Sequence, residues 1–191
     1  KDWVKNIGDF SKRVEEELDQ KQKKRQIKTV SKFIFDSHSE FIKFHLDFIE
    51  EVIRKEKKLD MVFYFRHVPL PNILSRDDIE RLKPFLPRIK WTIISKNASS
   101  LDNWCAKYWK GLGIKVKLGK DIPTNTMLII MNDYLMHIYL PRKSVEEWDK
   151  MFLVKNVDKV DLNKITEIIL EKKYKTTITI TKDKDIISLL K

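Results

Sequence analysis

Two nearly continuous apolar segments, 61–68 (MVFYFRHV) and 89–95 (IKWTIIS), constrain the fold more than any other feature of the sequence. Each has the length and the β-branched and aromatic content of a strand that is covered on both faces of a sheet. A helix-capping motif follows each segment, at Ser75–Asp78 and at Ser99–Asp102. Strands that alternate with helices predict parallel crossover connections. We therefore expect an α/β fold with a mixed, mostly parallel sheet flanked by helices.

The remaining pattern adds further elements to this sheet. We expect strands over 114–118, 127–131, 134–140 and 174–180, with a two-residue turn at 132–133. We expect helices over 99–111 and 161–173, a third from a capping motif at 144–147, and a last helix over 183–190. The segment 127–140 therefore predicts a local antiparallel hairpin within the sheet.

The first 57 residues are predicted to form a helical extension, and residues 58–191 the α/β domain. Apolar residues in 2–20 recur at helical spacing and form one narrow stripe. Such a stripe fits either a helix packed on its own domain or a dimerisation or linker helix. The apolar pattern from Val30 to about Arg54 also predicts a helix.

A basic run lies between these two predicted helices. The chain has 39 Lys and Arg against 28 Asp and Glu, a net charge of +11, which favours contact with polyanions. The cationic side chains of the run are Lys21, Lys23, Lys24, Arg25 and Lys28. They are either a solvated face or a set of phosphate contacts for DNA. The excess of charged residues also fits a heat-adapted protein without such a partner.

Several classes of site are not supported by the sequence. The single cysteine, Cys105, lies in a predicted helix among apolar residues and fits core packing. His38 and His45 alone are too few for a zinc site, so no metal is expected. No glycine motif for a nucleotide phosphate is present, and no cofactor is expected. Without a signal peptide or an apolar run of about 20 residues, we expect a cytoplasmic protein with no membrane contact.

A candidate pocket is expected where the strands end, because ligands of open α/β sheets bind beyond the carboxyl ends of parallel strands. The polar side chains at three such ends are Arg66, His67, Lys96, Asn97, Thr124, Asn125 and Thr126. They suit an anion or a polyol, or they simply cap strand ends in water. Paired carboxylates are missing from this set, so glycosidase or nuclease chemistry is not expected.

The segment from the helix end at Lys110 to Leu140 resembles the catalytic cassette of phospholipase D-like domains. In that family a glycine step leads into a strand, a His-x-Lys stretch follows, and an apolar strand ending in Asp precedes a hairpin. The glycine step is present at residues 113–116, but Thr124, Thr126 and Met131 occupy the His, Lys and Asp positions. The resemblance, over about residues 58–142, therefore implies the fold and the loss of the activity.

Non-catalytic domains of this kind occur in archaeal TrmB-like transcription regulators, where they bind sugars or mediate dimerisation. The resemblance implies a non-catalytic effector-binding or dimerisation domain that forms a homodimer, with DNA bound through a domain upstream of Lys1. An alternative is a stand-alone nucleic-acid-binding protein acting through the basic run of residues 21–28. A phospholipase D-like nuclease is the third interpretation.

Overall fold

The computed structural model describes residues 30–122, 126–182 and 187, so the predicted helix over 2–20, and all of that over 183–190 except residue 187, lie outside the described residues. The described chain forms a single seven-stranded sheet with the order β1-β7-β6-β5-β2-β3-β4. Its strands are β1 (Val30–Phe35), β2 (Leu59–Phe65), β3 (Ile89–Ser95), β4 (Lys115–Lys117), β5 (Met127–Met131), β6 (Tyr134–Tyr139) and β7 (Thr176–Lys182).

The α/β class is confirmed, but the expectation of a mostly parallel sheet is wrong. Only the β2–β3 and β3–β4 pairs are parallel. The β2–β5, β5–β6, β6–β7 and β7–β1 pairs are all antiparallel. The predicted alternation of strand and helix holds as far as β4, after which the hairpin β5–β6 enters the sheet beside β2 and reverses the direction of pairing.

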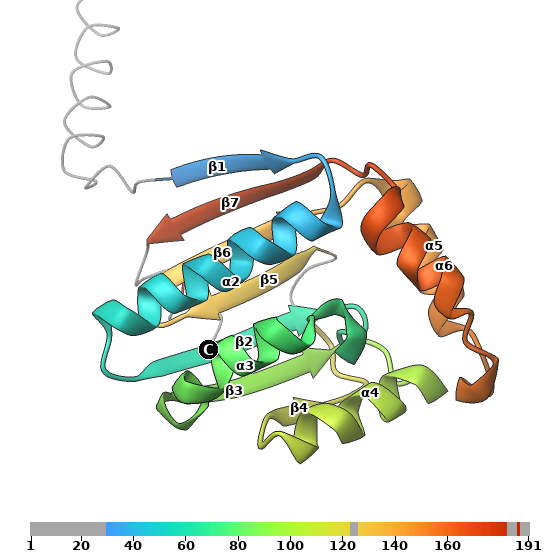
Figure 1. Cartoon of the computed structure of the whole chain (residues 1–191), viewed down its shortest axis with the longest axis horizontal. Helices are drawn as coiled ribbons and strands as arrows, with labels where there is room; N and C mark the ends of the chain where they lie inside the picture. The colour runs from blue at the N-terminus through green and yellow to red at the C-terminus, as the bar shows by residue number, and fades with distance from the viewer. Residues whose placement is uncertain (1–29, 123–125, 183–186, 188–191) are drawn as a thin grey trace, which may run out of the picture.

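The helices are α2 (His38–Lys55), α3 (Arg76–Leu82), α4 (Ser100–Gly111), α5 (Arg142–Phe152) and α6 (Leu162–Thr166), and a π-helical turn, Glu167–Glu171, continues α6. Short 3-10 turns cover Pro71–Ile73, Lys83–Arg88 and Val157–Lys159. In Figure 1, α2 runs across the sheet, while α5 and α6 are both at one end of it.

The capping motifs predicted at Ser75 and Ser99 are both confirmed, and they open α3 and α4. The motif predicted at residues 144–147 is wrong. Helix α5 begins earlier, with Pro141 at its N-cap and no side-chain cap, and Ser144 lies buried within its first turn.

The helical prediction from Val30 is wrong over its first residues. Val30–Phe35 is a strand that pairs with β7, and the helix begins only at His38, capped by Ser37. Alternating exposure along β1 explains the pattern, since Phe33 and Phe35 face the core while Ile34 is exposed. Residues 30–57, expected in the helical extension, therefore contribute a strand and a helix to the α/β unit.

The two faces of the sheet are covered differently. One face carries the large core, in which residues of β2, β3, β5, β6 and β7 pack with α2, α4, α5 and α6. The opposite face carries a smaller cluster of Tyr64, Ile122, Leu128, Ile130, Leu135 and Ile187. The predicted hairpin is confirmed: Asn132 turns the chain with a positive φ of 48°, and its side chain accepts a hydrogen bond from the Asp60 amide at 2.8 Å. That contact ties the hairpin to the start of β2.

Candidate functional site

The carboxyl ends of β2 and β3 meet because the two strands are parallel. Backbone hydrogen bonds join the residues that follow them: the Lys96 amide donates to the Phe65 carbonyl at 2.9 Å, and the Asn97 amide donates to the Arg66 carbonyl at 3.0 Å. This pairing holds Arg66, His67 and Asn97 at one edge of the sheet, as the sequence predicts for the candidate pocket.

His67 is the centre of a polar cluster at this edge. Its Nδ1 lies 3.1 Å from Oδ2 of Asp102, and its Nε2 lies 3.2 Å from both Asp149 Oδ1 and Asn97 Nδ2. A neutral ring accepts from Asn97 at Nε2, and a protonated ring donates to Asp149 there. The ring also stacks on Phe152, with the centroids 4.0 Å apart. His67 therefore links α4, α5 and the ends of β2 and β3.

The Asp102 carboxylate has a dual role that its capping motif did not reveal. Besides accepting from the backbone and hydroxyl of Ser99, it accepts a hydrogen bond from the Val68 amide at 2.8 Å. Burial favours the neutral acid, but the hydrogen bonds from His67, Ser99 and Val68 outweigh it and lower the pKa of Asp102. The side chain is fully buried, so the cluster stabilises a carboxylate inside the protein.

Arg66 and Asp149 form a bidentate ion pair at the margin of this cluster. Nε of Arg66 lies 3.1 Å from Oδ1 of Asp149, and Nη2 lies 2.5 Å from Oδ2. About a third of each side chain is exposed. The pair connects the loop after β2 to α5, and it neutralises the only Arg of the predicted pocket.

A cavity of about 270 Å³ adjoins the ion pair, between the sheet, α2, α5 and the loop after β2. Its polar lining residues are His38, His45, Arg66, His67, Thr126, Tyr139 and Asp149. The rest of the lining is aliphatic or aromatic, from Phe41 and Ile42 on α2 to Trp91 on β3 and Trp148 on α5. The volume lies near the lower end of the range of small-molecule sites, about 300–1,000 Å³.

The π-helical turn after α6 also contributes to the wall of the cavity. The adjacent residues Ile168 and Ile169 are both buried, and Ile169 lines the cavity. π-helical turns are rare in proteins. Those that occur are often at functional sites, because they change which side chains face inward.

Two buried histidines of α2 lie in the lining and are neutral near pH 7. Burial lowers the pKa of His38 to about 4, and burial lowers the pKa of His45 to about 4 as well. Nε2 of His38 lies 3.2 Å from the Ser144 hydroxyl and accepts a hydrogen bond from Trp148 Nε1 at 3.4 Å. Both histidines therefore add no charge to the lining of the cavity.

The seven predicted pocket residues separate into three groups. Arg66, His67 and Thr126 line the cavity, and Asn97 contacts the imidazole of His67. Lys96 takes part in the strand-end backbone pairing and does not line the cavity. Thr124 and Asn125 lie outside the described residues, as does the whole basic run of Lys21, Lys23, Lys24, Arg25 and Lys28.

Sequence reasoning missed Asp149 and the wall that α2 contributes. Asp149 stands on an amphipathic helix with nothing in its neighbours to mark it, so no pattern could identify it. The wall from α2 could have been found, because its apolar residues are too many for an exposed extension and are buried at helical spacing.

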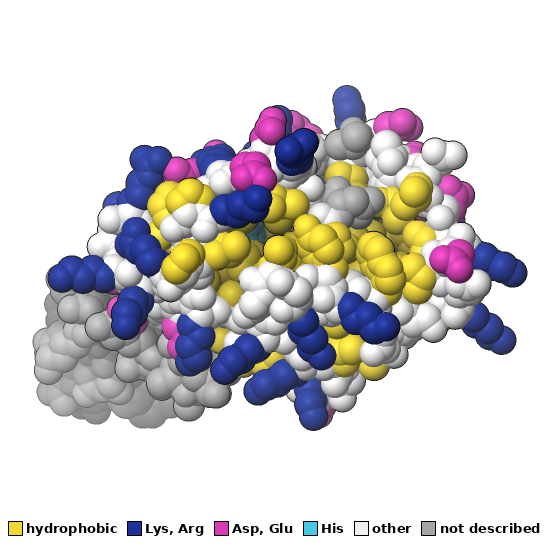
Figure 2. All heavy atoms as spheres, turned by 60° about the horizontal axis from the view of Figure 1, so that its bottom comes forward, with side chains coloured by type: hydrophobic (Ala, Val, Ile, Leu, Met, Phe, Trp, Pro, Cys, Tyr) yellow, Lys and Arg dark blue, Asp and Glu magenta, His cyan; other side chains and the backbone are white. Residues whose placement is uncertain are grey.

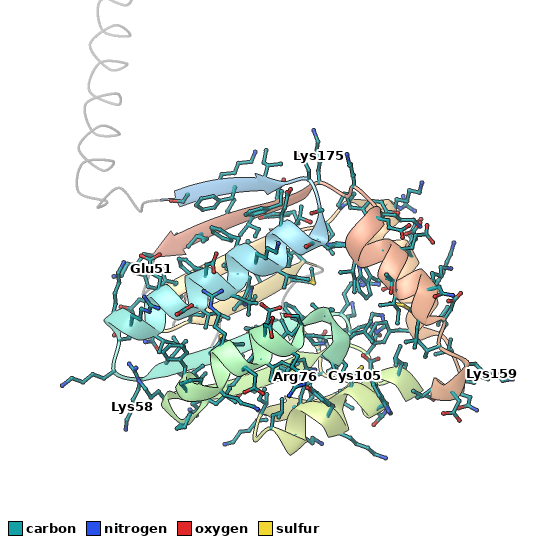
Figure 3. The ribbon with its side chains drawn as sticks, in the orientation of Figure 1. Glu51, Lys58, Arg76, Cys105, Lys159 and Lys175 are labelled. Carbon is teal, nitrogen blue, oxygen red and sulfur yellow. The ribbon has the colours of Figure 1, made fainter. Side chains whose placement is uncertain are left out.

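Cys105 and Met131 are both core residues. Cys105 of α4, labelled in Figure 3, is buried, and burial raises the pKa of its thiol to about 12. A thiol with such a pKa is a poor nucleophile at neutral pH. Met131, which the resemblance places at the Asp position of the cassette, is fully buried in the sheet.

The described residues contain neither a metal-binding cluster nor a membrane-crossing helix. No group of three or more His, Cys, Asp and Glu side chains among residues 30–122, 126–182 and 187 has the arrangement of a metal site. Within the same ranges, no helix has both the length and the apolar character that crossing a membrane requires.

Comparison with known proteins gives a distant structural likeness. No family model and no curated protein matches the chain. The chain is similar to a solved structure of TrmBL2, described as an archaeal chromatin protein with a novel mode of DNA binding, at a TM-score of 0.42 and 15% identity. The similar region covers 96% of this chain and 62% of that one, so this chain spans less than two thirds of its length.

Proposed function

We propose that the chain is a non-catalytic effector-binding domain of a TrmB-like transcription regulator, with a small molecule held in the cavity beside Arg66 and His67. The observation that carries the proposal is the cavity itself, about 270 Å³ of space within a close-packed domain. Concave, mostly apolar clefts with a few polar groups are the usual form of a small-molecule site. The assignment to a regulator rests on the resemblance of residues 58–142 to the degenerate cassette.

The polar groups around the cavity support binding over catalysis. His67 is engaged at both ring nitrogens, and Arg66 is paired with Asp149. Among the described residues, no Ser, Thr or Cys accompanies His67 in the manner of an activated nucleophile. This geometry suits the positioning of a ligand at the mouth of the cavity. We also expect such a domain to form a dimer.

The ion pair offers a route by which binding could reach the rest of a regulator. Arg66 follows β2 and Asp149 belongs to α5, so a ligand that favours one arrangement of this pair biases the position of α5. Differential contact of that kind is what an effector needs to shift a conformational equilibrium.

The test is a thermal-shift screen with sugars, nucleotides, amino acids and neutral aromatic compounds, combined with gel filtration. Leu140 lines the cavity, and Leu140→Trp fills it, while Leu153→Trp is the matched control at a side chain that is 77% exposed. We expect at least one compound class to raise the Tm of the wild type and of Leu153→Trp, with the effect absent in Leu140→Trp. A monomer with no shift from any class contradicts the proposal.

A second candidate function is nucleic-acid binding in its own right, favoured by the net charge of +11. Figure 2 shows one face on which many Lys and Arg side chains border a band of hydrophobic side chains. Lys58, Lys159 and Lys175, by contrast, are exposed at separate places on the periphery (Figure 3), so positive charge is also spread over the domain. This candidate therefore depends on the basic run of residues 21–28.

A further inference from the structure

One side chain in the wall of the cavity carries a hydrogen-bond donor that has no partner among the described residues. The indole of Trp91 lines the cavity and is 8% exposed, and its Nε1–H is buried without an acceptor. The other two indoles in the lining are satisfied, since Trp109 donates to the Pro69 carbonyl at 2.7 Å and Trp148 donates to His38. A buried donor without an acceptor is costly, and native proteins rarely keep one without a reason.

A second polar side chain of the lining contacts the same phenyl ring as Trp91. The imidazole of His45 packs against the rings of Phe41 and Phe63, at centroid distances of 5.9 Å and 5.6 Å. The Phe63 ring contacts Trp91 at 5.1 Å as well. The two polar groups therefore flank one phenyl ring, on the core side of the sheet.

The mostly apolar lining of the cavity does not fit charged or strongly polar ligands. Apart from Thr126 and Tyr139, whose hydroxyl is bonded to His137, the polar residues around the cavity are two neutral histidines and the cluster of Arg66, His67 and Asp149, in which the ion pair is already formed. A sugar would bring many hydroxyl groups to a wall that offers few partners for them. A ligand with a single acceptor, in contrast, satisfies the free donor and buries its apolar surface.

We infer that the cavity takes an uncharged, mostly apolar molecule that carries one hydrogen-bond acceptor, a carbonyl or hydroxyl oxygen, which accepts from Nε1 of Trp91. This rests on the proposed function, in that the cavity is a ligand site, and it replaces the sugar implied by the resemblance with a different chemical class. It also assigns Trp91 as the residue that selects for the acceptor.

The experiment compares acetophenone with ethylbenzene, which has a similar shape without the carbonyl oxygen. We expect the wild-type protein to bind acetophenone about tenfold more tightly in calorimetric titrations, the effect of one hydrogen bond to a buried donor. Trp91→Phe should bind both compounds alike. Trp104→Phe, at a side chain that is 47% exposed and outside the cavity, should keep the preference.

A second readout serves if Trp91→Phe does not fold. In the wild-type protein labelled with ¹⁵N-tryptophan, acetophenone should move one indole N–H resonance downfield, and ethylbenzene should not. Trp104→Phe identifies one of the other indole signals and should leave the shifted one in place.

The outcomes separate this inference from the proposed function. Equal binding of the two compounds by the wild type, or binding of glucose or maltose with neither aromatic compound bound, overturns the inference and leaves an effector site in place. Failure of every small molecule in the wider screen overturns both.

Discussion

Asp102 accepts a hydrogen bond from Nδ1 of His67 at 3.1 Å while it caps the helix on which it stands. One carboxylate thus fixes the start of α4, the loop after β2 through the Val68 amide, and the orientation of the imidazole at the cavity mouth. The same capping motif at Asp78 of α3 is local, with hydrogen bonds to Ser75 alone among the described residues. The two motifs therefore allow a matched comparison.

Asp102→Asn should lower the free energy of unfolding by about 2–4 kcal/mol, because the amide cannot accept from all the donors that now surround the carboxylate. Asp78→Asn should cost only about 0.5–1 kcal/mol, as expected for a helix cap at the surface. Urea denaturation at pH 7 measures both. Equal costs would mean that the contacts of Asp102 beyond its own helix contribute nothing.

The pH dependence of the Asp102 effect has a defined sign. Its pKa is lower in the folded protein than the ordinary value of 3.8, so its stabilisation is complete above that value and is lost as the pH falls below it. The difference between wild type and Asp102→Asn should therefore shrink only at strongly acidic pH. A difference that disappears already near pH 6 would contradict this assignment.

His45→Phe should make the protein less sensitive to mild acid. Burial lowers the pKa of His45 from 6.5 to about 4, so between these values the unfolded chain binds a proton that the folded protein does not. Stability therefore falls as the pH decreases through this window, and His45 accounts for about 2 kcal/mol between pH 7 and pH 5. His38 contributes in both proteins and serves as an internal reference. Parallel losses in the two proteins would refute the prediction.

A double-mutant cycle on Arg66→Ala and Asp149→Ala should give a coupling energy of about 0.5–1 kcal/mol. The pair is bidentate and only about a third exposed, which places it at the upper end for ion pairs in contact with solvent. The Arg142–Glu146 pair on the same helix is the control, since its side chains are 93% and 51% exposed. We expect that cycle to give a smaller coupling, and addition of salt should weaken it more.

The second candidate function predicts salt-dependent binding to arbitrary DNA. Replacing Lys23, Lys24 and Arg25 by Glu should weaken binding and reduce the slope of log K against log salt concentration, by about 0.9 for each phosphate that is no longer neutralised. The exposed pair Lys115 and Lys117 on β4 offers a control of the same chemistry, to be changed to Glu in parallel. Equal effects of both sets would show attraction by net charge alone, without a dedicated basic run.

The sequence predicts β3, the 132–133 turn and two helix caps well, because each depends on local chemistry. The direction of the strands was predicted wrongly, because hydrophobic periodicity indicates that a strand is buried but does not indicate which strand it pairs with. The hairpin could have joined the sheet at either edge, and only packing places β5 next to β2.

The candidate site was predictable in part for the same reason. Arg66, His67 and Asn97 follow parallel strands, so topology brings them together. Asp149 reaches them from a helix more than 80 positions along the chain from Arg66, and Trp91 stands in the middle of a strand that periodicity assigns wholly to the core. An unpartnered indole donor is invisible until its neighbours are known.

The pairing of β1 with β7 has a consequence for how the molecule is made. These strands come from opposite ends of the described chain, so β1 leaves the ribosome long before the strand that receives it exists. Until β7 is made, β6 also lacks its outer neighbour, and an unpaired hairpin edge is exposed to other nascent chains. Such a high contact order predicts slow final assembly, with the closing of the sheet as the last and most aggregation-prone step.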